Sequence, residues 1–303
     1  MAIQYLTYQQ IDKQQWDECI GAADNGLIYA CSYYLDAMAE NWDALVLNDY
    51  QIVMPLTWKK KYGICYLYQP YFTASLGVFG KDITHDITAQ FLQSIPAKFK
   101  YWDIYLNAGN FFELTNFPLH QRVNYVLPLT ERYEVLYKNF RENIKRNVKK
   151  AKQLNCTVVK DIAVDEIIAL AIEQSNQFST ITQKDYSRFK KLYNLLYVNN
   201  QAITYGVFSA RKELLASCVF FFYQKRAYYI LAGNHPDGKT YGASHTMLNV
   251  FIQEHAGTDL ILDFEGSNIS SLAFFYSSFG AVEEKYAGLK INNLPWWMKA
   301  FKS

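Results

Sequence analysis

The stretch LDFEGSNISSLAFFYSSFG, from Leu262 to Gly280, decides the fold that we expect for this chain of 303 residues. Its pattern predicts a buried strand over Leu260–Phe264 and, after the polar residues Glu265–Asn268, a short aromatic helix over Ser271–Ser278. The segment ends a series of alternating strands and helices. In such folds, polar groups at the carboxyl end of a buried strand are where ligands bind, so the stretch also predicts the position of a site.

The composition indicates a globular protein. Half of the residues are hydrophobic and 19% are charged, which excludes a disordered chain. The formal net charge of +2 gives no general case for binding nucleic acid or acidic lipid, so any basic partner site must be local. The 25 tyrosines suggest half-polar grooves, although aromatic-rich core strands explain them equally well.

Three features of the sequence indicate the compartment of the protein and whether it binds metal. They are its cysteines, its histidines and its amino terminus. The five cysteines are scattered without a CxxC pair, so we expect free thiols in a reducing compartment. The five histidines have no metal-ligand spacing, and we expect no metal. There is no signal peptide and no apolar run of about 18 residues. We therefore expect a cytoplasmic protein without a transmembrane segment.

The order of the predicted elements repeats. In each half a hairpin is followed by a third strand, a loop, a helix, a strand, a short aromatic segment and a closing strand. The repeat lies in element order and not in residue identity. We expect an α/β (α+β) fold with two mixed-sheet halves in tandem, residues 1–130 and residues 131–303, the second including the connecting helices. The alternative is a single irregular α+β domain.

The connection between the halves carries a basic stripe. Apolar residues at helical spacing predict one helix over Tyr133–Gln153. On that helix Arg141, Lys145 and Lys149 lie on one side, where they would bind the phosphates of tRNA, CoA or a lipid-linked precursor. The alternative is an ordinary solvated basic face.

The segment around the last predicted helix resembles a known family. Together with the hairpin, loop, helix and strand before it, this segment is similar to the end of proteins of the GNAT acyltransferase superfamily. The residues that carry the resemblance are Asn268, Ala273, Phe275, Tyr276, Phe279 and Gly280. Two GNAT-like halves joined by a basic helix resemble the Fem-type peptidoglycan aminoacyl/peptidyl transferases and their FemAB-like relatives. The segments NIKRNVKKA (143–151), QPYFTASLGVFG (69–80) and DFEGS (263–267) carry part of that resemblance.

The resemblance implies a phosphate-binding loop before the helix of the second half. In GNAT proteins this loop holds the pyrophosphate of acyl-CoA, and here it corresponds to Asp237–Ser244. The candidate cofactor-binding residues are Lys239, Thr240, Gly242, Ala243 and Ser244. The loop departs from the usual glycine pattern, and Fem-type enzymes take an aminoacyl group from tRNA. Acyl-CoA and aminoacyl-tRNA both remain open as co-substrates, with no covalently bound cofactor, and the loop is alternatively an ordinary turn with Ser244 as helix cap.

Three residues are candidates for catalysis. Asp263 and Glu265 alternate along the strand and its exit and so share a face. A carboxylate there would deprotonate an attacking amine, and Glu265 is the stronger candidate. The resemblance implies that Tyr276 protonates a leaving thiolate. The alternatives are a carboxylate paired with a nearby Arg or Lys, and a tyrosine that only packs.

These patterns together predict a transferase. It would move an acyl or aminoacyl group to an amine on a small-molecule or lipid-linked acceptor, such as a cell-wall or polysaccharide precursor. No nucleophilic Ser or Cys arrangement is visible, so direct attack is expected. The alternative is a non-catalytic ligand-binding protein that keeps the scaffold.

Overall fold

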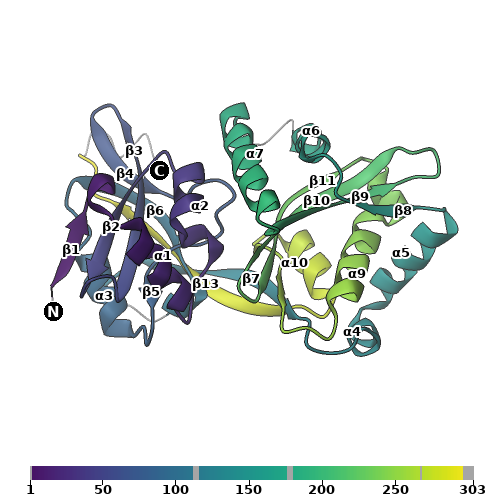
Figure 1. The fold of residues 1–303 in the computed structure, drawn as a ribbon, viewed down its shortest axis with the longest axis horizontal. Coiled ribbons are helices and arrows are strands. Elements are labelled where there is room, and N and C mark those ends of the chain that lie inside the picture. Colours follow the sequence, from purple (N-terminus) through teal and green to yellow (C-terminus); the bar gives the residue numbers. More distant parts are fainter. Residues whose placement is uncertain (1, 112–115, 176–179, 267, 296–303) are drawn as a thin grey trace. The chain divides into compact units, whose positions relative to one another are not determined.

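The computed structural model describes residues 2–111, 116–175, 180–266 and 268–295. The chain forms two compact units, and each contains a sheet flanked by helices (Figure 1). The first unit comprises Met1–Arg122 with Lys285–Ser303, and the second comprises Val123–Glu284.

The sheet of the first unit has the strand order β1-β2-β3-β4-β6-β13, with β5 paired to β3. All neighbours are antiparallel except β4 and β6, which are parallel. Its strands are β1 (Ile3–Leu6), β2 (Asn41–Leu47), β3 (Ile52–Lys61), β4 (Ile64–Tyr68), β5 (Phe79–Gly80), β6 (Phe99–Leu106) and β13 (Val282–Asn292). Its α-helices are α1 (Lys13–Ala22), α2 (Ser32–Met38) and α3 (His85–Gln93), and the 3-10 turns are Tyr8–Gln10, Ile28–Ala30 and Ala108–Asn110.

The sheet of the second unit has the order β7-β12-β11-β10-β9-β8, and only β11 and β12 are parallel. Helices α6 and α7 cover one face of this sheet, and α9 with α5 covers the other (Figure 1). The strands are β7 (Leu119–Pro128), β8 (Thr157–Lys160), β9 (Ala202–Phe208), β10 (Leu214–Tyr223), β11 (Arg226–Asn234) and β12 (Ile261–Asp263). The helices are α4 (Tyr133–Asn139), α5 (Glu142–Gln153), α6 (Val164–Ser175), α7 (Gln183–Val198), α8 (Gly238–Tyr241), α9 (Ala243–His255) and α10 (Ser270–Ser277).

The two sheets repeat one design. In each, four antiparallel strands lead to a single parallel pair, followed by one antiparallel closing strand. This confirms the predicted α/β architecture of two mixed sheets in tandem. The closing strands are exchanged: β7 pairs with β12 of the second unit, and β13 pairs with β6 of the first. The compact units are therefore not continuous in sequence, and the division into residues 1–130 and 131–303 remains a prediction that follows chain order.

The prediction of one helix over Tyr133–Gln153 is wrong. The chain is extended at Phe140 and Arg141, so α4 and α5 are separate helices. Tertiary contacts explain the break. The buried Phe140 ring packs edge-on against Phe279 at 5.3 Å, and the backbone N–H of Arg141 donates to the carbonyl of Ser278.

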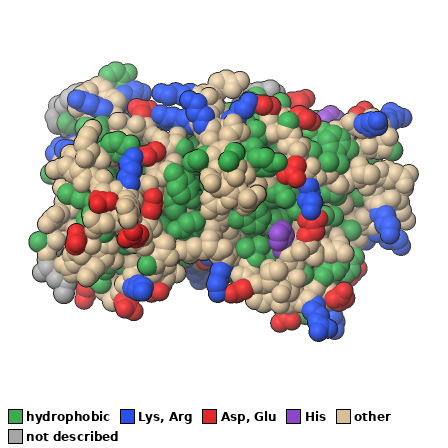
Figure 2. Space-filling model, in the orientation of Figure 1, with side chains coloured by type: hydrophobic (Ala, Val, Ile, Leu, Met, Phe, Trp, Pro, Cys, Tyr) green, Lys and Arg blue, Asp and Glu red, His purple; other side chains and the backbone are tan. Residues whose placement is uncertain are grey.

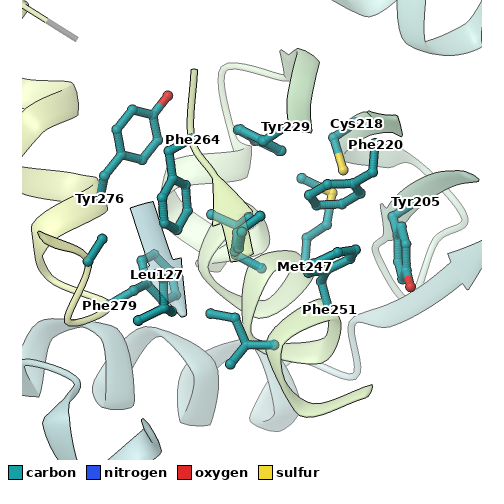
Figure 3. Packing of buried hydrophobic residues seen from close by; sticks show 14 of the residues in the cluster. Leu127, Tyr205, Cys218, Phe220, Tyr229, Met247, Phe251, Phe264, Tyr276 and Phe279 are labelled. Atoms are coloured by element: carbon teal, nitrogen blue, oxygen red, sulfur yellow. The ribbon is translucent and has the colours of Figure 1, made fainter. Parts of the chain in front are cut away.

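Aromatic side chains dominate the core of the second unit (Figure 3). The rings of Phe220 on β10 and Phe251 on α9 are stacked with centroids 3.8 Å apart, which fixes α9 on the sheet. The five cysteines are free thiols. Among the helices of the described residues, none combines the length and the apolar character needed to cross a membrane.

Candidate functional site

The site lies where the parallel strands of the second unit separate. β11 and β12 share three register pairs, the last between Tyr228 and Asp263. β12 ends there, while β11 continues to Asn234 without a partner in β12. The loop after Asp263 and the helix α10 follow directly from this fork, so polar groups of that segment are placed at its opening.

The corresponding fork of the first unit is closed by its own chain. β4 ends at Tyr68, and the side-chain oxygen of Gln69 accepts a hydrogen bond from the N–H of Tyr105. Leu76 then bonds to both Tyr105 and Asn107, which occupies the backbone groups at the end of β6. Of the two forks, the second therefore offers the better ligand site.

Both carboxylate oxygens of Asp263 accept hydrogen bonds from groups of the protein. Its Oδ2 accepts from Arg226 at 2.6 Å, and its Oδ1 accepts from Asn124 and from the backbone N–H of Glu265, both at 2.9 Å. Arg226 and Asn124 also bind Glu284, at 3.0 and 3.1 Å. Two carboxylates share one guanidinium, and burial raises the pKa of Asp263 despite that charge. Glu284 is partly exposed, and the hydrogen bond and charge of Arg226 hold its pKa below the ordinary value.

Glu265 stands at the exit of the fork in an unusual backbone conformation. Its φ is +66°, and that of Gly266 is +70°. A non-glycine residue in this region costs about 1 kcal/mol or more, and turns elsewhere in the chain also contain such residues. The bond from the Glu265 N–H to Asp263 holds the turn. The side chain is half-buried, and its negative charge contributes to the raised pKa of Tyr276.

Tyr276 places its hydroxyl away from the core that holds its ring (Figure 3). The ring stacks on Phe264 with centroids 4.8 Å apart, and only 7% of the residue is exposed. Burial, with a further contribution from the charge of Glu265, raises the pKa of this phenol above its ordinary value. The hydroxyl is protonated at neutral pH, as it would be at the ordinary pKa near 10, and is available to donate a hydrogen bond.

His245 lies beside this helix in the first turn of α9. Its ring meets Phe275 edge-on at 5.0 Å, and its Nε2 is 3.4 Å from the amide of Asn147. Burial lowers the pKa of His245 to about 4, so the imidazole is neutral at physiological pH.

The predicted phosphate-binding loop forms the short helix α8 and the first turn of α9. A Cβ added at Gly242 would lie 2.6 Å from the carbonyl oxygen of Asn147, so this glycine allows α5 to pack closely against α9. Ala243 is buried, and Ser244 donates to the side chain of Asn234 instead of capping the helix. Lys239 and Thr240 are exposed.

The predicted basic stripe lies on α5 and its amino-terminal cap. The guanidinium of Arg141 stacks on Phe274 of α10, 4.9 Å from the ring centroid. Lys145 is 3.0 Å from Glu142, and Lys149 is exposed. The structure therefore brings Arg141 to α10, the helix that carries Tyr276, while Lys149 lies two turns further along α5.

Arg226, Glu284 and Asn124 belong to the site but were not identified from the sequence. They come from β11, β13 and β7, which are far apart in the chain. An arginine at the first position of a strand gives no signal of its own. Within the described residues, no group of three His, Cys, Asp or Glu side chains is arranged to hold a metal ion.

Comparisons with known proteins bear on the fold. No protein-family model matches the sequence, and no curated protein sequence matches it. Among solved structures, FemX matches over 100% of both chains with a TM-score of 0.68 and 13% identity. A conserved protein of unknown function from Bacteroides thetaiotaomicron matches with a TM-score of 0.61 and 11% identity, over 95% of this chain and 99% of that one.

A third similar structure is the C-terminal domain of a putative lysylphosphatidylglycerol synthetase from Agrobacterium fabrum. Its TM-score is 0.59 at 10% identity, over 92% of this chain and 91% of that one. Identities this low show the fold alone. The chain has the FemX-like tandem GNAT fold, and the resemblance predicted from its carboxyl-terminal segment is confirmed for the fold.

Proposed function

We propose that this tandem GNAT-fold chain is an acyltransferase that moves an acyl or aminoacyl group from an activated ester or thioester to an amine. The observation that carries the proposal is the open fork between β11 and β12, with Glu265 and Tyr276 at its exit. Polar groups at a strand's carboxyl end, beside diverging parallel strands, are where open α/β sheets bind ligands.

The reaction would proceed by direct attack. The neutral amine adds to the carbonyl carbon of the donor, a C–N bond forms, and the C–S or C–O bond to the donor breaks. Glu265 takes the proton that the amine loses. Tyr276, which is protonated at neutral pH, donates a hydrogen bond or a proton to the departing sulfur or oxygen.

Asp263 has a positioning role in this proposal. Both of its oxygens accept hydrogen bonds from protein groups, and one of those bonds fixes the backbone of Glu265. It is not placed to take a proton from substrate. The pair predicted from the sequence thus divides into one base, Glu265, and one residue that positions it.

The donor that the geometry favours is an aminoacyl ester of tRNA. The close packing of α5 on Gly242 covers part of the helix start where a CoA pyrophosphate would bind. The basic residues of α5 supply charge for an RNA backbone instead. The acceptor is an amine of a small molecule or of a cell-wall or polysaccharide precursor.

Thermal shift separates the two donors. A ligand that binds the native state raises the melting temperature by mass action. We expect a shift with aminoacyl-tRNA and none with acetyl-CoA or longer acyl-CoAs. A shift with acyl-CoA alone would reverse the choice of donor, and the absence of any shift would favour the non-catalytic alternative.

Activity is tested by the release of free tRNA or CoA in the presence of a panel of amines. We expect Glu265→Gln to lower the rate by about 10²- to 10⁴-fold, with donor binding retained. Tyr276→Phe removes only the hydroxyl and should also lower the rate. The matched control is Tyr133→Phe, since the Tyr133 hydroxyl bonds to Asn249 away from the fork. Unchanged rates in both site variants would refute the assignment.

A further inference from the structure

The second unit has a cleft that lies apart from the fork. The cleft is formed by α5, α9 and the edge strand β8, and its volume is about 690 Å³. In the sheet, β10 and β9 stand between β11 and β8, so the fork and the cleft are separate sites. A cleft of this size, lined by apolar side chains and a few polar groups, is the usual form of a small-molecule site.

Asn249 on α9 brings an unfilled hydrogen bond to the cleft. It lines the cleft and is 5% exposed, and its Oδ1 accepts from the hydroxyl of Tyr133 at 2.8 Å. The described part of the chain provides no acceptor for its Nδ2 group. A buried amide that lacks a hydrogen bond is costly, so Asn249 favours a ligand that brings a carbonyl oxygen.

Thr246 supplies an acceptor one turn before Asn249. Its hydroxyl donates to the carbonyl of Gly242 at 3.1 Å, which leaves the hydroxyl oxygen available to accept. Residues three apart lie on the same side of a helix. The donor of Asn249 and the acceptor of Thr246 therefore match the C=O and the N–H of one amide group.

The remaining walls of the cleft are apolar and carry one cation. The side chains of Val148, Val158 and Val250 come from α5, β8 and α9 and are partly buried. Lys152 is the one charged residue among the described residues that line the cleft. Figure 2 shows Lys and Arg side chains over the region that α5 occupies in Figure 1. These walls suit aliphatic groups and a carboxylate.

A free ammonium group of a ligand would find no partner in this cleft. Glu254 follows the lining residue Gln253, but its carboxylate accepts from the hydroxyl of Tyr205 and lies 3.2 Å from Lys160. An amino acid whose nitrogen is acylated has no ammonium group, so it fits where a free amino acid or a dipeptide does not.

We propose that the cleft binds an N-acylated aliphatic amino acid. Its amide would lie between Asn249 and Thr246, its carboxylate would pair with Lys152, and its two apolar ends would cover the valines. A nucleotide would satisfy Lys152 but binds best on an open aromatic ring. The one aromatic ring of the described lining, that of Tyr133, is packed against Tyr137 with centroids 5.5 Å apart. The inference goes beyond the proposed acyl transfer, because this binding requires neither donor nor acceptor.

Protection of Cys156 from alkylation tests the proposal. Cys156 lines the cleft and is half-buried, and Cys65 of the first unit, also half-buried, is the internal control. The probe is N-butanoyl-L-leucine, which at its size should bind with a Kd on the order of 1 mM. At about ten times that concentration the fraction of open cleft falls about tenfold. We expect Cys156 to react with iodoacetamide more slowly by that factor, read by mass spectrometry, and Cys65 to react unchanged.

Analogues and variants separate the contacts. N-butanoyl-L-leucinamide lacks the carboxylate, and 2-butanoyloxy-4-methylpentanoate has an ester oxygen in place of the amide N–H, so each should bind about fivefold more weakly. Lys152→Ser should weaken the binding of the probe about fivefold and leave that of the leucinamide unchanged. Asn249→Ala removes the donor to the carbonyl and should weaken binding about tenfold. The matched control is Lys150→Ser, at an exposed lysine outside the cleft lining, which should bind the probe as the wild type does.

Three outcomes would overturn the proposal. The first is that the probe leaves the reaction of Cys156 unchanged, or slows it equally in Lys152→Ser. The second is that leucine and butanoate, added together, protect Cys156 as well as the probe does, because the amide would then have no role. The third is protection by tRNA but not by the probe, which would assign the cleft to the donor. Glu265→Gln should bind the probe normally, so a failed transferase assay and a failed cleft assignment are distinguishable.

Discussion

The side chain of Asp263 holds the backbone of Glu265. Its Oδ1 accepts the Glu265 N–H at 2.9 Å, two residues on, in a turn where Glu265 has a φ of +66°. The same carboxylate is anchored from the other side by Arg226 at 2.6 Å. The backbone of the candidate base is therefore fixed by a buried ion pair that does not itself meet substrate.

Replacing Asp263 with asparagine tests this arrangement. The change keeps the shape but removes the buried charge that pairs with the partly exposed Arg226, so we expect the free energy of unfolding to fall by about 2–4 kcal/mol in urea denaturation. Glu265→Gln should change it by less than about 1 kcal/mol, because that side chain is half-exposed and is not the anchor of the turn. Equal stability of Asp263→Asn and wild type would show that the ion pair does not hold the fork.

Local sequence pattern predicted most strands and helices of this fold. The aromatic helix before Gly280 and the hairpin of β9 and β10 follow from spacing and turn residues alone. The pairing of strands that are far apart in the chain could not be predicted from the sequence. Nothing in the sequence indicates that β7 pairs with β12 while β13 pairs with β6, because both closing strands have ordinary strand patterns. The break at Phe140 was missed for the same reason, since the contacts with Phe279 and Ser278 that cause it come from the other end of the unit.

Only part of the candidate site could be predicted from the sequence. Glu265 and Tyr276 could be proposed from the sequence because they lie in one continuous segment, and their roles stay predictions. Arg226 and Glu284 were not, because only the fold brings them to Asp263. For Gly242, the sequence suggested space for a phosphate. The distance to Asn147 assigns that space to a neighbouring helix, which no single-sequence pattern reports.

A substitution at Gly242 tests its role in helix packing. In Gly242→Ala the new Cβ would meet the carbonyl oxygen of Asn147 at 2.6 Å, at a residue whose φ is +69°. Steric overlap and backbone strain together should lower the free energy of unfolding by about 2–4 kcal/mol. The measurement is again denaturant unfolding.

Gly257→Ala is the matched control for that change. Gly257 has a φ of +78°, but no atom of the described part of the chain lies within 4 Å of an added Cβ. Only the backbone strain remains, so we expect a loss of about 1 kcal/mol. If both variants lose the same amount, the contact between α5 and α9 is not the constraint at Gly242.

Two buried serines should respond oppositely to alanine. The Ser217 hydroxyl on β10 is buried and has no hydrogen-bond partner among the residues that the structure describes. The Ser278 hydroxyl donates to the carbonyl of Phe274 at 2.6 Å. Ser217→Ala removes an unsatisfied polar group and should leave stability unchanged or raise it by up to about 1 kcal/mol. Ser278→Ala should lower it by about 1 kcal/mol. A destabilised Ser217→Ala would mean that the hydroxyl has a partner in solution.

The partly buried His245 predicts a loss of stability in acid. Burial lowers its pKa to about 4 in the folded protein, while an unfolded chain has the ordinary value near 6.5. Between these values the unfolded state binds more protons, so the free energy of unfolding falls as the pH decreases from 6.5 to 4. The contribution of this one residue reaches about 3 kcal/mol at the lower end.

His245→Phe isolates that contribution, because phenylalanine keeps an aromatic ring against Phe275 and does not titrate. Carboxylates and the other histidines titrate in both proteins and cancel in the difference. We expect the stability of wild type relative to the variant, from urea denaturation at each pH, to be constant above pH 7 and to fall steadily below 6.5. Parallel curves down to pH 4 would mean that His245 is as easily protonated in the folded protein as in the unfolded chain, and that its ring is open to water.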